Sequence, residues 1–131
     1  MADYEGISIV SELYTDKVKD MSEAMADVLK RYPDLDGVFC TNEDVADMYL
    51  GLDKGENTPV MVGVDATSVQ QKAITDGQEL GTVSQDPYDI GYQTIIAAAQ
   101  AMSTDPAQAA SVEKNVLLEP KWIDASNIDD A

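Results

Sequence analysis

The chain has 131 residues, which is the size of one ordinary domain, and 44% of them are hydrophobic, as in globular proteins. Lys and Arg number 8 against 25 Asp and Glu, for a formal net charge of −17. This charge argues against nucleic acid and anionic membranes as partners, because both attract clustered positive charge. The absence of His and the single Cys40 exclude a His-based triad, an internal disulfide and a Cys-rich zinc site.

Apolar runs alternate with helical patterns along the first half of the chain. Residues 7–13 predict a strand, and residues 16–32 predict a helix with apolar side chains at helical spacing. Residues 37–41 predict a short buried strand. Thr41 and Asp44 then have the spacing of a capping box, which predicts the start of a second helix there.

The same alternation continues in the middle of the chain. Residues 60–64 form an apolar run that predicts a strand. Thr67 and Gln70 have capping-box spacing, so a helix is expected to begin there. Residues 80–84 predict the next strand.

The last third begins with a strong helix signal. Asp86 is a good N-cap and Pro87 suits the first helical position, so a helix is predicted from here to about Met102. Residues 103–111 are expected to form a polar loop and residues 116–118 a fifth short strand. The whole pattern predicts an α/β fold, a parallel sheet of βαβ units.

Three hydrogen-bonding side chains follow successive predicted strands: Asn42, Asp65 and Gln85. Ligands of parallel α/β sheets bind beyond the carboxyl ends of the strands. A carboxylate that accepts and amides that both donate and accept suit a neutral polyhydroxylated ligand. Asn and Asp also favour caps and turns for local reasons, so Gln85, the least cap-like of the three, is the most informative.

Three segments carry a resemblance to a known family. They are GVFCTNEDVA at residues 37–46, VMVGVD at residues 60–65, and DG followed by GTVSQDP and IG between residues 76 and 91. In order and spacing they resemble the type I periplasmic binding proteins, in particular the ribose- and galactose-binding receptors. The similarity covers roughly residues 7 to 102.

The resemblance implies specific residue roles. The ligand-contacting Asn of the family matches Asn42, its sugar-hydroxyl-binding Asp matches Asp65, and its polar residue before the crossing between lobes matches Gln85. The family also stacks an aromatic ring on the sugar. Tyr14 and Tyr88 are the nearest candidates here, with Tyr88 the better match to a packing residue.

The resemblance also implies that the chain is an incomplete, Rossmann-like lobe of the periplasmic-binding-protein type. Residues 1–85 correspond to part of the C-terminal ligand-binding lobe, residues 86–119 to the helix and strand that cross to the N-terminal lobe, and residues 120–131 to a returning tail. The opening strands of the lobe, one of them central in its sheet, are absent. We therefore expect a C-terminal fragment that binds ligand weakly or not at all and that self-associates.

For the parent protein, the resemblance implies a receptor of an ABC importer that binds a sugar or similar solute between two lobes by hinge closure. It would work with a membrane permease, in the periplasm or anchored outside the cell, and the N-terminal residues of this chain predict no signal peptide. The main alternative is the effector-binding domain of a LacI-like transcription regulator, although such regulators usually carry Asp-Asp where this chain has Asp65 followed by Ala66.

A second alternative is a receiver- or flavodoxin-like enzyme domain, but neither its paired acids nor a phosphate-binding Gly-rich loop is present. We predict no enzymatic activity, no cofactor and no metal, since Asp34 and Asp36 are too few ligands for a calcium loop. Cys40 lies in an apolar strand and is predicted to be a small buried hydrophobic residue.

Overall fold

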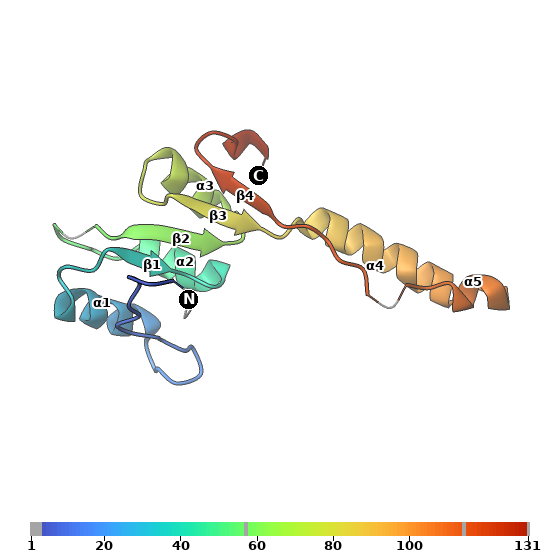
Figure 1. Cartoon of the computed structure of the whole chain (residues 1–131), viewed down its shortest axis with the longest axis horizontal. Helices are drawn as coiled ribbons and strands as arrows, with labels where there is room; N and C mark the ends of the chain where they lie inside the picture. Colours follow the sequence, from blue (N-terminus) through green and yellow to red (C-terminus); the bar gives the residue numbers. More distant parts are fainter. Residues whose placement is uncertain (1–3, 57, 114, 131) are drawn as a thin grey trace.

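A four-stranded sheet with helices packed on one face forms the body of the chain (Figure 1). The computed structural model describes residues 4–56, 58–113 and 115–130. The elements in chain order are α1 (Met21–Arg31), β1 (Gly37–Phe39), α2 (Glu43–Leu50), β2 (Val60–Val64), α3 (Ser68–Thr75), β3 (Gly81–Ser84), α4 (Pro87–Ala101), α5 (Pro106–Ala110), β4 (Lys121–Asp124) and the 3-10 helix η1 (Ile128–Asp130).

The strands lie in the order β1-β2-β3-β4. β1, β2 and β3 run parallel, with Phe39 opposite Val62 and Val62 opposite Gly81. β4 pairs with β3 in the antiparallel direction. The predicted α/β class with a parallel sheet of βαβ units is confirmed for β1 to β3, and β4 adds an antiparallel edge.

The predicted first strand is wrong. Residues 7–13 form no strand, and Ile7 and Ile9 are 57% and 54% exposed. An apolar run becomes a strand only where another strand offers it hydrogen bonds, and no described segment pairs with this one. Leu13 at its end still packs against the hydrophobic core.

The predicted last strand is displaced along the chain. Residues 116–118 are irregular and Leu117 is 92% exposed. The strand is β4 instead, where Ile123 is fully buried opposite Thr82 of β3. Burial against an existing strand therefore decided which short segment joined the sheet.

The helix starts follow their capping side chains. α1 begins later than predicted, because the carboxylate of Asp20 accepts from the backbone N–H of Glu23 at 2.9 Å. The cap of α2 is Asn42 rather than Thr41: its Oδ1 accepts from Val45 N at 3.0 Å. The Thr67–Gln70 capping box is confirmed.

The start of α4 is confirmed as predicted, with Asp86 as its cap and Pro87 in the first turn. The loop predicted at residues 103–111 contains the short helix α5, which begins after the cap Asp105. Asp105 accepts from Ala107 N at 2.9 Å, so a local hydrogen bond starts a helix within this polar segment.

The hydrophobic core lies between the helices and one face of the sheet. Its members are buried and come from α1, α2, β2 and the residue after β1: Met21, Met25, Leu29, Cys40, Ala46, Tyr49 and Met61. Cys40 is 2% exposed, which confirms its predicted burial. The opposite face is open among the described residues, where Phe39, Val60 and Trp122 are about half exposed.

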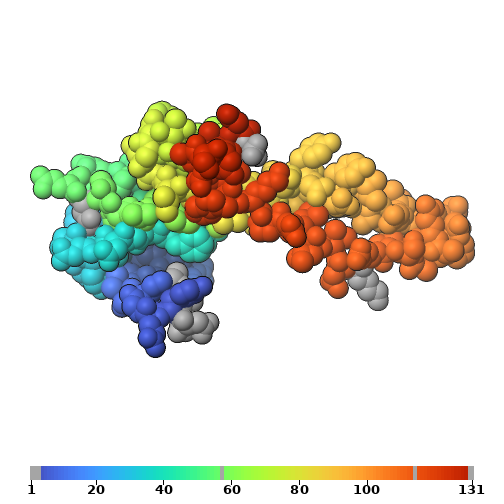
Figure 2. All heavy atoms as spheres, turned by 45° about the horizontal axis from the view of Figure 1, so that its top comes forward, coloured from blue at the N-terminus to red at the C-terminus, as the bar shows by residue number. Residues whose placement is uncertain are grey.

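α4 and α5 project from this body as an arm (Figures 1 and 2). α4 has no buried residue. The chain then runs back along the arm and enters β4, so the arm begins and ends at the sheet. No helix in the described part of the chain has the length and apolar character needed to cross a membrane.

Candidate functional site

The three predicted site residues follow three neighbouring parallel strands. Asn42 lies after β1, Asp65 directly after β2 and Gln85 directly after β3. Because the carboxyl ends of parallel strands meet at one edge of a sheet, all three lie along that edge. Successive strands are about 4.8 Å apart, so the row extends over about 10 Å.

Asn42 has a structural task at this edge. Its Oδ1 caps α2 by accepting from Val45 N, and the side chain is otherwise exposed. The Nδ2 group has no hydrogen-bond partner among the described residues, so it is free to donate to a ligand. The local and the ligand-binding interpretations of Asn42 are therefore compatible.

Asp65 lies in an unusual backbone conformation. Its φ angle is +73°, in the left-handed region that Asp tolerates better than most residues. The backbone is held on both sides, since Asp65 N donates to Val83 O at 2.9 Å and the Thr82 hydroxyl donates to Asp65 O. The half-buried carboxylate has no hydrogen-bond partner among the described residues.

Gln85 has no capping role. The cap of α4 is the next residue, Asp86, whose carboxylate accepts from Asp89 N at 3.1 Å and lies 3.8 Å from Lys121 Nζ. Asp86 also has a positive φ, of 48°. Gln85 itself is exposed, with no side-chain hydrogen bond to the described residues.

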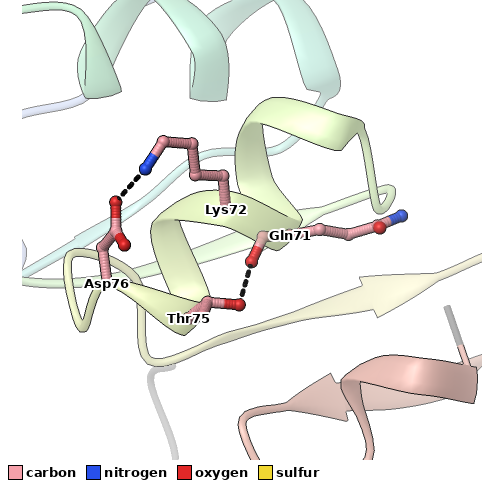
Figure 3. Close-up of polar contacts among 4 residues, drawn as sticks. All are labelled: Gln71, Lys72, Thr75 and Asp76. Atoms are coloured by element: carbon pink, nitrogen blue, oxygen red, sulfur yellow. Dashed lines mark hydrogen bonds and ion pairs between the residues drawn. The ribbon is translucent and has the colours of Figure 1, made fainter.

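The loop after β2 is held in place by α3. Gln71 Nε2 donates to Ala66 O at 2.8 Å. Figure 3 shows Gln71 and Lys72 on different sides of the helix, with Lys72 paired to Asp76 and the Thr75 hydroxyl donating to Gln71 O at 2.9 Å. The last two contacts lie within α3 and its C-cap, whereas the bond from Gln71 to Ala66 joins the helix to the loop after β2.

A buried polar cluster behind Asp65 was not predicted from the sequence. Gln70, Glu79 and Thr82 are almost completely buried between α3 and the sheet. A Cβ at Gly63 would lie 2.5 Å from Gln70 Nε2 and 2.6 Å from Glu79 Oε1, so glycine leaves the space that the cluster fills. The capping-box spacing of Gln70 was the only sequence signal near it.

Burial changes the acid–base properties of this region. Desolvation raises the pKa of Glu79 to about 7, the hydrogen bond from Gln70 opposes this, and the nearby Asp47 adds to it. Burial, with the charge of Glu79, raises the pKa of the Cys40 thiol to about 11. The Cys40 thiol therefore stays protonated and unreactive near neutral pH.

At the edge that carries the three residues, Asn42 and Gln85 are exposed and Asp65 is half buried. Two surface hollows lie along α4, the first lined by Pro87, Tyr88, Gly91, Tyr92 and Ile95. Tyr88 is 82% exposed, so its ring is not packed inside the described part of the chain. Tyr14 is half exposed with Lys17 Nζ 4.0 Å from its ring centre. No three described Cys, Asp or Glu residues converge as metal ligands.

Comparison with known proteins supplies the family. Residues 1–106 match the family described as "Periplasmic binding protein domain". The chain belongs to the periplasmic binding protein family. The ribose import binding protein RbsB of Escherichia coli (strain K12) is 29% identical over 99 residues, which are 72% of this chain and 32% of that protein. RbsB of Salmonella typhimurium gives the same values.

Solved structures agree on the fold of this periplasmic binding protein chain. A protein described as an ABC transporter, LacI family transcriptional regulator, from Brachyspira murdochii superposes with a TM-score of 0.64 at 27% identity, covering 83% of this chain and 38% of that one. AraP, an arabinose-binding protein from Geobacillus stearothermophilus, gives a TM-score of 0.61 at 19% identity, covering 84% and 40%. AraP supports the fold alone.

The predicted family and its incomplete α/β lobe are therefore confirmed. The chain spans about a third of the length of the curated relatives it matches. RbsB is named as a ribose import binding protein and AraP as an arabinose-binding protein.

Proposed function

We propose that this chain is part of the C-terminal lobe of a solute receptor of an ABC importer, and that Asn42, Asp65 and Gln85 hydrogen-bond a sugar or similar polyhydroxylated solute. The observation that carries the proposal is the placement of these three side chains at the ends of adjacent strands. A row of about 10 Å, from the usual strand spacing, lets one small ligand reach all three.

The chemistry of the three side chains fits such a ligand. The carboxylate of Asp65 accepts hydrogen bonds from two hydroxyl groups, and the amides of Asn42 and Gln85 both donate and accept. Apart from Asn42 Oδ1, which accepts from Val45 N, none of these groups forms a hydrogen bond with the described residues. The set contains no activated nucleophile or base, which favours binding over catalysis.

We further propose that residues 1–85 belong to the ligand-binding lobe, residues 86–119 cross to an N-terminal lobe, and residues 120–131 return. The arm of α4 and α5 supports this division, because α4 carries one acid, Asp89, and no Lys or Arg, yet has no buried residue. An apolar helix of this kind is normally covered. A second lobe that closes over the ligand would cover it and complete the site.

In this proposal the parent protein lies in the periplasm or is anchored outside the cell, and delivers its ligand to a membrane permease. The alternative of a LacI-like regulator draws on the similarity to the Brachyspira protein, whose description names both an ABC transporter and a LacI family transcriptional regulator. Both alternatives share the sugar site. They are separated by whether the purified parent stimulates ATP-dependent sugar uptake in proteoliposomes with its permease, or binds operator DNA.

The binding proposal is tested by saturation-transfer NMR of the chain with D-ribose, L-arabinose and D-galactose. We expect transfer to at least one sugar, with a dissociation constant in the millimolar range or weaker, because one lobe provides half of a closing site. The variant Asp65→Asn keeps a residue type that tolerates a positive φ but lacks the charged acceptor, and should lose the signal.

Asn42→Asp provides a matched control for the capping role. Asp caps helices as well as Asn does, so the fold should be kept, while the donating amide is lost. Weakened sugar transfer with unchanged stability supports a ligand role for Asn42. Unchanged transfer for both variants contradicts the proposed site.

A further inference from the structure

A buried carboxyl group lies close to the candidate site and has no task in it. Glu79 is 2% exposed. Its Oε1 accepts from Gln70 Nε2 at 3.2 Å, while its Oε2 is buried with no hydrogen-bond partner in the described part of the chain. A carboxylate with one unpaired buried oxygen is costly, so its protonation state matters to its neighbours.

Gln70 distributes its hydrogen bonds among more acceptors than it can serve at once. Its Nε2 lies 3.2 Å from Glu79 Oε1, 3.1 Å from Thr82 Oγ1 and 3.3 Å from Val64 O. An amide nitrogen has two hydrogens for these three acceptors. A charged carboxylate attracts an N–H more strongly than a neutral one, so the charge on Glu79 decides how firmly Thr82 and Val64 are bonded.

Thr82 passes this effect to the candidate site. Its hydroxyl accepts from Gln70 and donates its one hydrogen to the backbone carbonyl of Asp65. Asp65 has the positive φ described above, and that conformation persists only where its surroundings hold it. Hydrogen-bond contacts through Gln70 and Thr82 therefore connect the Glu79 carboxyl to the Asp65 backbone.

We propose that Gln70, Glu79 and Thr82 form a positioning network for Asp65, through which the protonation of Glu79 adjusts the candidate ligand site. Glu79 sets the hydrogen bonds of Gln70, Gln70 sets those of Thr82, and Thr82 holds the carbonyl of Asp65. The positioning of Asp65 stands on these contacts; its effect on sugar rests on the proposed function.

Burial and nearby charges place the protonation of Glu79 near neutral pH. Burial raises the pKa of Glu79 to about 7, and Asp47 on α2 acts in the same direction. Burial first, and then the charge of Glu79, raises the pKa of Cys40 to about 11. Burial first, and then the interaction with Cys40, raises the pKa of Tyr49 to about 12, so both groups are neutral near pH 7. Glu79 is thus the group of the network that changes charge there.

The test is an NMR titration of the 131-residue chain without any sugar. The ¹³C shifts of the Glu79 carboxyl and the Asp65 backbone carbonyl are followed between about pH 5 and about pH 9, above the ordinary range of an aspartate. We expect both to change with one shared midpoint near that of Glu79. Glu79→Gln should abolish the Asp65 transition.

Thr82→Val and Thr82→Ser separate positioning from general structure. Val removes the hydroxyl link, so Glu79 should still titrate while Asp65 no longer responds; Ser restores the hydroxyl and should restore the response. An unchanged Asp65 transition in Glu79→Gln or Thr82→Val overturns the proposal. If Thr82→Val does not fold, a flat Asp65 signal in the wild type would overturn it alone.

Sugar binding is measured separately, so that the network and the proposed function can fail independently. If Asp65 follows Glu79 but no sugar binds, the network stands and the proposed function fails. If sugar binds with the same affinity at about pH 5.5 and about pH 8.5, on either side of the Glu79 transition, the link from network to ligand is refuted.

Discussion

Glu79 should make the stability of this chain depend on pH. Its pKa is about 7 in the folded chain against an ordinary value of 4.5. Between these values the folded chain keeps a proton that the unfolded chain has released, so stability falls as the pH rises and levels off above pH 7. The loss should reach about 3 kcal/mol, at 1.36 kcal/mol for each pKa unit.

The measurement is urea unfolding at a series of pH values from 5 upward. Glu79→Gln is the matched control, because it keeps the size of the side chain and removes the charge. The difference between wild type and Glu79→Gln isolates this residue from the general effect of the net charge. If the unfolding free energies of the wild type and Glu79→Gln change in parallel with pH, the Glu79 carboxyl is not buried as described.

Gly63 should be intolerant of a side chain. A Cβ there would lie 2.5 Å from Gln70 Nε2, 2.6 Å from Glu79 Oε1 and 3.2 Å from Thr82 Oγ1. Gly63→Ala should therefore cost about 1–3 kcal/mol of unfolding free energy, the usual cost of overpacking.

The control for Gly63 is Gly91→Ala in α4, where a Cβ meets nothing within 4 Å. It should raise the helix content seen by circular dichroism, because Ala has about 1 kcal/mol better helix propensity than Gly. Equal effects of the two substitutions on unfolding would refute the tight packing around Gly63.

For single residues, the sequence predicted which side chains lie at the strand ends better than which side chains are buried. Asn42, Asp65 and Gln85 lie at one sheet edge as expected, because strand ends follow from local pattern. The cluster of Gln70, Glu79 and Thr82 could not be predicted. Their burial depends on how α3, the loop after it and β3 pack together, and this is a property of the folded whole.

The cap of α3 offers a test at the scale of an element. The Thr67 hydroxyl accepts from Gln70 N at 3.1 Å and donates to Asp47 Oδ1 at 3.1 Å, so it joins α3 to α2 as well as capping it. Thr67→Ala should destabilise the chain by about 1 kcal/mol, and by up to about 2 kcal/mol if both bonds contribute.

Ser68→Ala is the matched control, because Ser68 is exposed in the first turn of the same helix. It should change the stability by less than about 0.5 kcal/mol, as is usual for surface positions. Urea unfolding of both variants gives the comparison. A loss for Ser68→Ala as large as that for Thr67→Ala would contradict a specific role for the cap.

Elements that depend on local signals were predicted well, and those that depend on partners were not. The helices starting at Ser68 and Pro87 follow capping residues that the sequence displays. Residues 7–13 and 116–118 have the composition of strands but no described strand pairs with them. Ile123 shows the converse, because contact with Thr82 makes its segment a strand.

The exposed arm of α4 and α5 should make the whole molecule self-associate. Tyr88, Tyr92, Ile95 and Met102 are at least half exposed along or just after α4. A contiguous apolar surface of this kind promotes association, and salt screens the repulsion between chains of charge −17. At about 0.15 M salt, light scattering should give a mass above the 14.1 kDa of one chain.

Ile95→Glu should shift the chain toward the monomer, because it puts a charge in the middle of the arm. Val69→Glu adds the same charge at a half-exposed position of α3 and should leave the mass unchanged. A wild-type monomer across the accessible concentration range would show that the arm does not mediate association.

The proposed half of a sugar site at the ends of β1, β2 and β3 can be tested directly on the whole chain. The measurement is a map of backbone amide NMR shifts while D-ribose is added to high millimolar concentration. We expect shifts at Asn42, Asp65 and Gln85 and their neighbours, with one common dissociation constant, and none along α5. Shifts confined to other surfaces, or none with D-ribose, L-arabinose or D-galactose, would contradict the proposed site.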